Sequence, residues 1–400
     1  MMNQRKLVLL TVIVAVIAVT GFLGVNFAFN GASNISTHRI ASSPEKAEPV
    51  KQLSTSMLKP VNNYLYLPAK YHRFLYQNGT VEPLYTQSPA PMGIGFFGLE
   101  NMSGTLIGNN YYASSFEAVI DINNLSVFNL ADDAPSSLTF QLNTVTANTT
   151  LFGNSSYTFW TQNVATYSVR THEISFVDNI WNFSSPGAEV TSNAILNSTG
   201  TIYPYPGVHI ALGPTFYLPT PFTLLLYMNT SEINGNNVFY FNYSIPTIGV
   251  SGTYDRVTFN STYGMPPAYK APPSYFRVSG TQLNPAGLLY DAEIMMGGPG
   301  GGSTTTITDI NGIMQLKYIS ATNPMHSSAP HPQPSPPGKP AVAKSYANVP
   351  NAFDFGTDTG ETSVGAAVAW NSQDQAILST GPSLLYGMWN VSSAKIMDHF

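Results

Sequence analysis

The chain has 400 residues, of which only 9% are charged, against about 25% in ordinary soluble proteins. Its net charge of −5 offers no basic surface for nucleic acid, and the absence of cysteine excludes disulfides, thiolate nucleophiles and iron–sulfur clusters. Apolar residues reach 43%, so the low charge does not indicate disorder.

This scarcity of charge favours a surface exposed to strong acid. Near pH 2 carboxylates protonate while Lys, Arg and His stay charged, so a chain rich in basic residues would repel itself. With 16 Lys and Arg and 7 His, the positive charge stays modest at full protonation. A glycosylated surface protein at neutral pH is the alternative.

Residues 1–30 direct the chain out of the cytoplasm. Arg5 and Lys6 precede an uncharged run, Leu7 to Phe29, that exceeds a typical signal-peptide core and is long enough to span a bilayer. It is a signal peptide or an N-terminal membrane anchor, and both place the rest outside. Asn-x-Ser/Thr sequons along the chain fit a glycosylated surface. We expect a protein that is extracellular or anchored to the outer face of the cell membrane.

Residues 31–88 hold a large share of the Lys and Arg, and part of this segment could be helical. We interpret it as a propeptide or a stalk. A basic propeptide can pair with ionised carboxylates at neutral pH and lose these pairs when the carboxylates protonate. A plain linker is the alternative.

From residue 89 to residue 322 the sequence changes to short strands and turns. Ser156–Val169 is rich in aromatic and β-branched residues, and Phe222–Ile245 predicts a hairpin with its turn at Asn234-Gly235. Helical periodicity is scarce. We therefore predict an all-β body of mainly antiparallel sheets, sandwich- or barrel-like.

Residues 323–350 are rich in proline and are interpreted as a linker or insertion. Residues 351–400 carry strand-like sequence but are too few to fold alone, so we expect them to complete the body. We expect the whole to be a monomer.

Two acids precede a glycine-rich segment near the end of the body. Asp291 and Glu293 have the spacing of residues on one face of a strand. The glycines from Gly297 to Gly302, interrupted by Pro299, leave a backbone that another chain, such as a bound peptide, can approach closely. A flexible loop after an edge strand is the alternative.

A second acidic stretch reads Asp358-Thr359-Gly360, followed at once by Glu361. Pepsin-type proteases carry Asp-Thr-Gly twice, whereas here Ser379 stands where the second Asp would be needed, so the chain is not a pepsin. A polar loop between two strands is the alternative interpretation.

No cofactor or metal is expected. Gly93–Gly98 matches G-x-G-x-x-G, but prolines precede it and no helical pattern follows it, so the dinucleotide fingerprint fails. In acid, histidine is protonated and cannot act as a general base, and metal ligands are protonated too. Two carboxyl groups that share one proton can still catalyse peptide hydrolysis in acid, because one activates water while the other polarises the peptide carbonyl.

Several stretches resemble the thermopsin family of archaeal acid proteases, and the two most specific read "YDAEIMMGGPGGGSTT" and "NAFDFGTDTGETSVG". The matched stretches are Ala90–Leu99, Phe159–Val164, Ile174–Pro186, Leu218–Ser231, Tyr290–Thr305 and Asn351–Gly365. The resemblance implies a secreted endopeptidase that prefers large apolar residues. The acids inside the matched motifs, Glu293, Asp358 and Glu361, are the candidate catalytic residues, with Asp178 and Asp291 in reserve.

The sequence is therefore compatible with two functions of different classes. As an acid endopeptidase, the protein would bind peptide or protein substrates in extended form along a sheet edge, with aromatic pockets for their side chains. As a non-catalytic, glycosylated cell-surface or adhesion protein, it would use the same carboxylates only to close turns.

Overall fold

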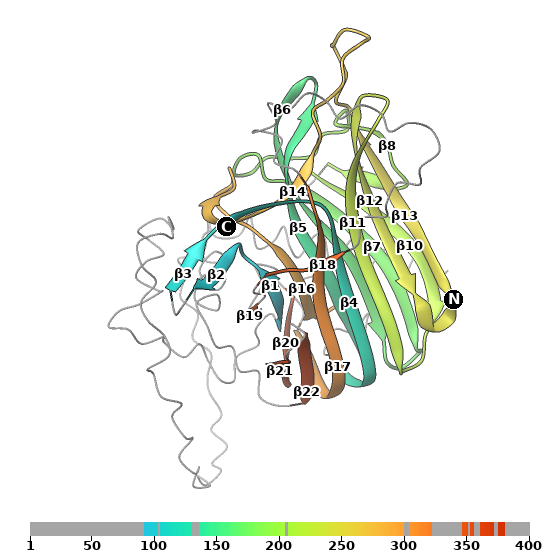
Figure 1. Cartoon of the computed structure of the whole chain (residues 1–400). Helices are drawn as coiled ribbons and strands as arrows, with labels where there is room; N and C mark the ends of the chain where they lie inside the picture. Colours follow the sequence, from blue (N-terminus) through green and yellow to red (C-terminus); the bar gives the residue numbers. More distant parts are fainter. Residues whose placement is uncertain are drawn as a thin grey trace, which may run out of the picture.

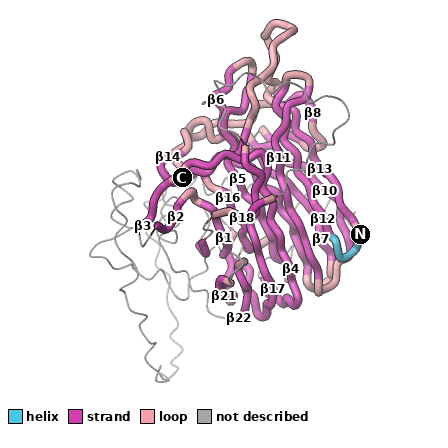
Figure 2. Tube along the Cα trace, in the orientation of Figure 1, coloured by secondary structure: helices cyan, strands magenta, loops and turns pink. Residues whose placement is uncertain are grey.

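The computed structural model describes residues 92–102, 105–129, 136–204, 207–299, 304–321, 346–350, 353–355, 361–371 and 375–380. This part consists of strands and turns, with one 3-10 turn at Pro246–Ile248 and no α-helix (Figures 1 and 2). The predicted all-β, mainly antiparallel fold is confirmed. Among the described residues no helix has the length and apolarity needed to cross a membrane. The leader, Leu7–Phe29, and the segment 31–88 lie outside the described residues.

One antiparallel run of strands, the first ladder, contains the strands that surround Glu293. In order it is formed by β9 (Thr201–Tyr203), β10 (Val208–Tyr217), β7 (Glu173–Asn182), β6 (Asn154–Ser168), β5 (Ser137–Leu151), β16 (Ala292–Gly297), β1 (Met92–Phe96) and β19 (Phe353–Phe355). Strands far apart in sequence thus meet at β16, which lies between β5 and β1.

A second antiparallel run, the second ladder, packs against the first. In order it is formed by β8 (Ile195–Asn197), β13 (Val250–Phe259), β12 (Asn236–Ile245), β11 (Phe222–Ile233), β4 (Asn110–Asn129), β17 (Thr304–Ser320), β22 (Ala376–Thr380) and β21 (Ala366–Trp370). The predicted hairpin is confirmed as β11 and β12, with positive φ angles of 53° at Asn234 and 82° at Gly235, as a tight hairpin turn requires.

The remaining strands connect these runs. β14 (Tyr275–Leu283) pairs with both β4 and β5 and so joins the two ladders, and β15 (Leu289–Tyr290) pairs with β14. β18 (Ala347–Asn348) and β20 (Thr362–Val364) pair with β17, the latter in parallel. β2 (Leu99–Met102) and β3 (Thr105–Gly108) form a separate hairpin. Figure 1 shows the sheet curling into an open half-barrel.

Aromatic rings fill the space between the two ladders. The ring of Phe159 on β6 lies 4.9 Å from that of Phe259 on β13, and Phe176 on β7 lies 4.6 Å from Tyr243 on β12. Tyr167 lies 5.0 Å from Phe222 in the same way. Such ring pairs add to the burial of apolar surface, so this layer is the main core.

The core defines two faces of the first ladder. Leu138, Phe140 and Leu142 of β5 belong to the core, so they lie on the inner face. Side chains alternate along a strand, and Thr139, Gln141 and Asn143 therefore lie on the opposite, outer face. All three are nonetheless buried. The outer face of β5 is thus a buried polar surface.

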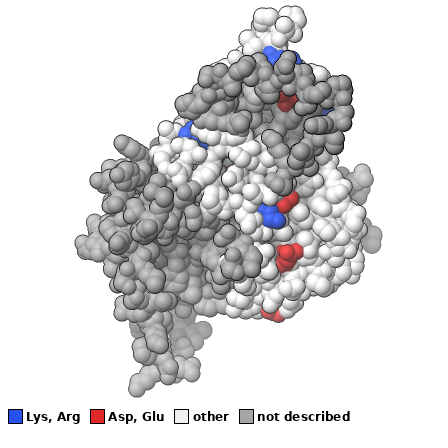
Figure 3. All heavy atoms as spheres, in the orientation of Figure 1, with Lys and Arg blue, Asp and Glu red and all other residues white. Residues whose placement is uncertain are grey.

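The described surface carries few charged groups on the face drawn in Figure 3, in agreement with the low content of charged residues in the sequence. Two of these groups, one basic and one acidic, lie side by side amid uncharged atoms (Figure 3). Of the sequons, Asn242 and Asn260 are buried, whereas Asn124, Asn154 and Asn197 are exposed. Burial closes Asn242 and Asn260 to a glycan in the folded protein, whereas the three exposed asparagines are accessible to one.

Candidate active site

Glu293 lies in the middle of the first ladder on its outer face. It pairs with Gly95 of β1 on one side and with Asn143 of β5 on the other, and its side chain is only 2% exposed. Asn143 Nδ2 donates a hydrogen bond to Glu293 Oε2 at 3.3 Å. A buried carboxyl group is thus held by a neutral amide donor.

This amide is the end of a longer hydrogen-bond chain. Gln162 Nε2 on β6 donates to both Asn143 Oδ1 (3.2 Å) and Gln141 Oε1 (2.9 Å). Gln141 Nε2 donates to Thr139 Oγ1 (3.0 Å), which in turn donates to the carbonyl oxygen of Gly298 (2.9 Å). We call these four residues the amide chain: Thr139, Gln141, Gln162 and Asn143. It links the glycine-rich segment to Glu293.

Glu361 is brought to the same strand as Glu293. A Cβ added to Gly297 at the end of β16 would lie 2.8 Å from Met295 Cε, 3.0 Å from Glu361 Cβ and 3.2 Å from the Glu361 carbonyl carbon, so glycine at this position allows Glu361 to approach the strand closely. Ser363 Oγ donates to Met296 O at 3.0 Å and fastens the segment to β16. Glu361 itself is buried.

Alternation places the Gly297 position on the outer face with Glu293, four residues away. At about 3.3 Å per residue, the two positions are about 13 Å apart along the strand. Glu293 therefore lies on the outer face of β16, and Glu361 approaches the end of the same face at Gly297, although the two acids are far apart in sequence.

The other predicted acids are placed differently. Asp358 lies outside the described residues. Asp291 is buried but sits in the break between β15 and β16, where its carbonyl accepts a hydrogen bond from Val145 N. The single strand expected to carry both Asp291 and Glu293 therefore begins only at Ala292.

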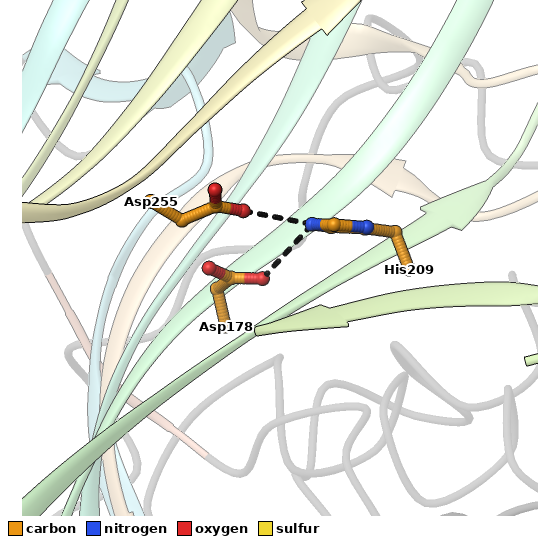
Figure 4. A group of neighbouring side chains, drawn as sticks. All are labelled: Asp178, His209 and Asp255. Atoms are coloured by element: carbon orange, nitrogen blue, oxygen red, sulfur yellow. Dashed lines mark hydrogen bonds and ion pairs between the residues drawn. The ribbon is translucent and has the colours of Figure 1, made fainter. Parts of the chain in front are cut away.

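Asp178, the reserve candidate, lies on β7 on the inner face, in a second acidic cluster. His209 Nε2 of β10 lies 2.8 Å from Asp255 Oδ2 of β13 and 3.7 Å from Asp178 Oδ1, and all three side chains are fully or almost fully buried (Figure 4). Asp178 Oδ1 also accepts the amide hydrogen of Ala211 at 3.1 Å. The cluster thus joins the two ladders inside the core.

The pKa values of Asp178 and Asp255 are shifted in opposite directions. Complete burial, and then the neighbouring Asp255 carboxylate, hold the pKa of Asp178 well above its usual range. Burial also acts to raise the pKa of Asp255, but hydrogen bonds from His209 and Thr199 outweigh it and lower that pKa. Asp178 is therefore the protonated acid and Asp255 the carboxylate of the pair.

Among the described residues, Asp178, His209 and Asp255 form the group that could hold a metal ion. Their possible ligand atoms all lie within 4.8 Å of one another. Bonds of about 2.0 Å around a tetrahedral zinc would separate neighbouring ligand atoms by about 3.3 Å. The 2.8 Å from His209 to Asp255 is a hydrogen-bond distance instead. These side chains fit a hydrogen-bonded core cluster, which lies on the inner face, between the two ladders.

Sequence reasoning missed the residues that support both groups. The amide chain left a signal, because Thr139, Gln141 and Asn143 alternate with Leu138, Phe140 and Leu142, which is the pattern of a strand with one polar face. His209 and Asp255 left none, because they come from separate strands and meet Asp178 only through the folding of the two ladders.

Comparison with known proteins identifies the family of this chain. A family model described as Thermopsin matches residues 77–331. A curated relative named Thermopsin, from Sulfolobus acidocaldarius, is 27% identical over 333 residues, which cover 77% of this chain and 88% of the relative. Because the family model spans more than half of the chain, the chain belongs to the thermopsin family of proteases.

Proposed function

We propose that this chain is a secreted or surface-anchored acid endopeptidase, in which Glu293 and Glu361 form the catalytic carboxyl pair. The approach of Glu361 to Gly297, on the strand and face of Glu293, is the observation that carries this proposal. The proposal requires the two glutamate side chains to extend toward one another along this face, across a backbone separation of about 13 Å. Asp358, three residues before Glu361, remains a third candidate.

The pair performs hydrolysis without metal or histidine. The ionised carboxylate takes a proton from water, and the water oxygen attacks the scissile carbonyl carbon while the protonated carboxyl gives its proton to the carbonyl oxygen. The resulting neutral tetrahedral intermediate returns one hydroxyl proton to the second carboxylate. The first carboxyl protonates the amine as the carbon–nitrogen bond breaks, which restores both groups.

Apolar side chains on the same face support the proposed preference for large apolar residues. After Asn143 and Gln162, the next outer-face positions on β5 and β6 are Val145 and Trp160. They belong to a small apolar cluster with Tyr290, and the Trp160 ring stacks at 5.7 Å on Phe183. We propose this cluster as the pocket beside the reacting bond.

Single substitutions test the pair. Glu293→Gln and Glu361→Gln should each lower the rate of casein cleavage at pH 3 by about 10²-fold or more, because each removes one of two required proton-transfer groups. Glu173→Gln, at an exposed glutamate on β7, is the matched control and should keep full activity. Asp358→Asn in the same assay decides whether that residue replaces either glutamate.

Thermal unfolding of each variant separates catalysis from folding. The proposal holds if both glutamine variants fold with the melting temperature of the parent and are inactive. Activity above one-tenth of the parent in either variant contradicts the assignment of that residue. Lack of any cleavage by the parent protein between pH 1 and pH 6 contradicts the function itself.

A further inference from the structure

We propose that the amide chain fixes Glu293 as the ionised, water-activating member of the pair and leaves Glu361 as the proton donor. This inference rests on the proposed function and assigns roles within that site. Asn143 is a positioning residue here, because it acts on Glu293 and not on the substrate.

The direction of every hydrogen bond in the amide chain follows from the first bond, between Thr139 and Gly298. The carbonyl oxygen of Gly298 can only accept, so the hydroxyl of Thr139 must donate to it. The same hydroxyl oxygen then accepts from the amide nitrogen of Gln141, which turns the Gln141 oxygen toward Gln162.

The second half of the chain carries this direction to the carboxyl group. Gln162 must present its NH₂ group, and its two hydrogens go to the oxygens of Gln141 and Asn143. Asn143 is then left with its own NH₂ group facing Glu293 Oε2. A reversed amide at any point would set two NH₂ groups or two oxygens against each other.

A donor fixed in this way favours the charged form of its partner. Hydrogen bonding to a carboxylate stabilises the ionised state, whereas an acceptor in the same place would stabilise the protonated acid. On this ground the proposal assigns the ionised form to Glu293. The shared proton then resides on Glu361.

The choice of side chains suits chemistry in acid. Amides and hydroxyls neither gain nor lose protons in the pH range of an acid protease, so the chain keeps its direction at every working pH. A histidine or a carboxyl group at Asn143 would change its charge in or near that range. The assignment of base and acid is thus independent of the acidity outside.

The acidic limb of the pH profile of kcat/KM reports the ionisation of the base in the free enzyme. Asn143→Leu removes the donor at similar size and should move this limb upward by about one pH unit. Gln162→Met leaves Asn143 able to turn its amide and should move the limb in the same direction by less. Both shifts are measured on the protein expressed from the full chain, with a chromogenic peptide as substrate.

Asn163→Leu is the matched control. Asn163 neighbours Gln162 on β6, is equally buried, and lies on the inner face, where its Oδ1 accepts a hydrogen bond from Tyr254. This variant should lower the melting temperature without moving the limb. It shows what the loss of a buried amide does to folding alone.

The outcomes separate this inference from the proposed function. If Glu293→Gln is inactive while Asn143→Leu and Gln162→Met keep the limb of the parent, the role of the amide chain is wrong and the catalytic pair stands. If Glu293→Gln is active, the pair itself is wrong. An upward shift in Asn143→Leu that Asn163→Leu does not show supports the inference, and a downward shift overturns it.

Discussion

Replacement of Asp178 by asparagine should make the protein's stability less dependent on pH. Asparagine keeps the shape of the protonated acid, can accept the Ala211 amide hydrogen, and cannot ionise. In the native protein, burial and the Asp255 carboxylate raise the pKa of Asp178 far above that of an aspartate in the unfolded chain. The folded state therefore holds a proton that the unfolded state releases.

The sign and size of the effect follow from this difference. A raised folded-state pKa gives stability that is complete below the unfolded pKa of about 3.9 and is lost as pH rises toward the folded-state pKa. One proton corresponds to about 1.4 kcal/mol of unfolding free energy per pH unit. Parent and Asp178→Asn should thus be similar at pH 3, and the variant should be more stable by about 1.5 kcal/mol at pH 5.

Urea unfolding at half-unit steps from pH 3 to pH 7 measures the difference. The pH at which the two curves stop diverging gives the pKa of Asp178 in the folded protein. Glu173→Gln, which removes an exposed carboxylate on the same strand, should run parallel to the parent. A constant difference between parent and Asp178→Asn across this range would refute the protonated assignment of Asp178.

Other consequences are open to simple measurements. Asp255→Asn should cost more stability at pH 6 than at pH 2 in urea unfolding, because the lowered pKa of Asp255 gives stability that is lost as pH falls. Gly297→Ala should reduce activity at pH 3 by about tenfold or more with a stability loss of about 1–3 kcal/mol, since the new methyl would lie 3.0 Å from Glu361 Cβ and 2.8 Å from Met295 Cε and would displace them. Trp160→Ala should raise KM for peptides with large apolar residues, and an unchanged KM would contradict the proposed pocket. A chelator should leave activity at pH 3 unchanged, and a loss that zinc restores would place a metal in the Asp178 cluster.

The strands could be predicted because their signals are local. Asn234-Gly235 supplies the two positive φ angles of a tight hairpin turn, and the flanking residues are aromatic and β-branched. The partition of strands into two ladders could not be predicted, because β14 joins them through pairings with both β4 and β5. Such pairings depend on long-range packing that no short stretch encodes.

Part of the candidate site could be proposed from local sequence for the same reason. Glu293 and Glu361 stand out because acids are scarce and glycines surround them. Their neighbourhood depends on Gly297, whose role as a contact point appears only when the chain after residue 345 returns to β16. Asp178 is a reserve candidate from the sequence, and the strand period directs it into the core and Glu293 away from it.

The C-terminal strands have a further consequence for the integrity of the enzyme. β19 pairs with β1, while β18, β20 and β22 all pair with β17, so this part is attached to the body by hydrogen-bonded ladders as well as by the peptide chain. A protease that nicks its own backbone between Ala321 and Tyr346 would keep both fragments together. A cut there would yield two associated chains, one carrying Glu293 and the other Glu361.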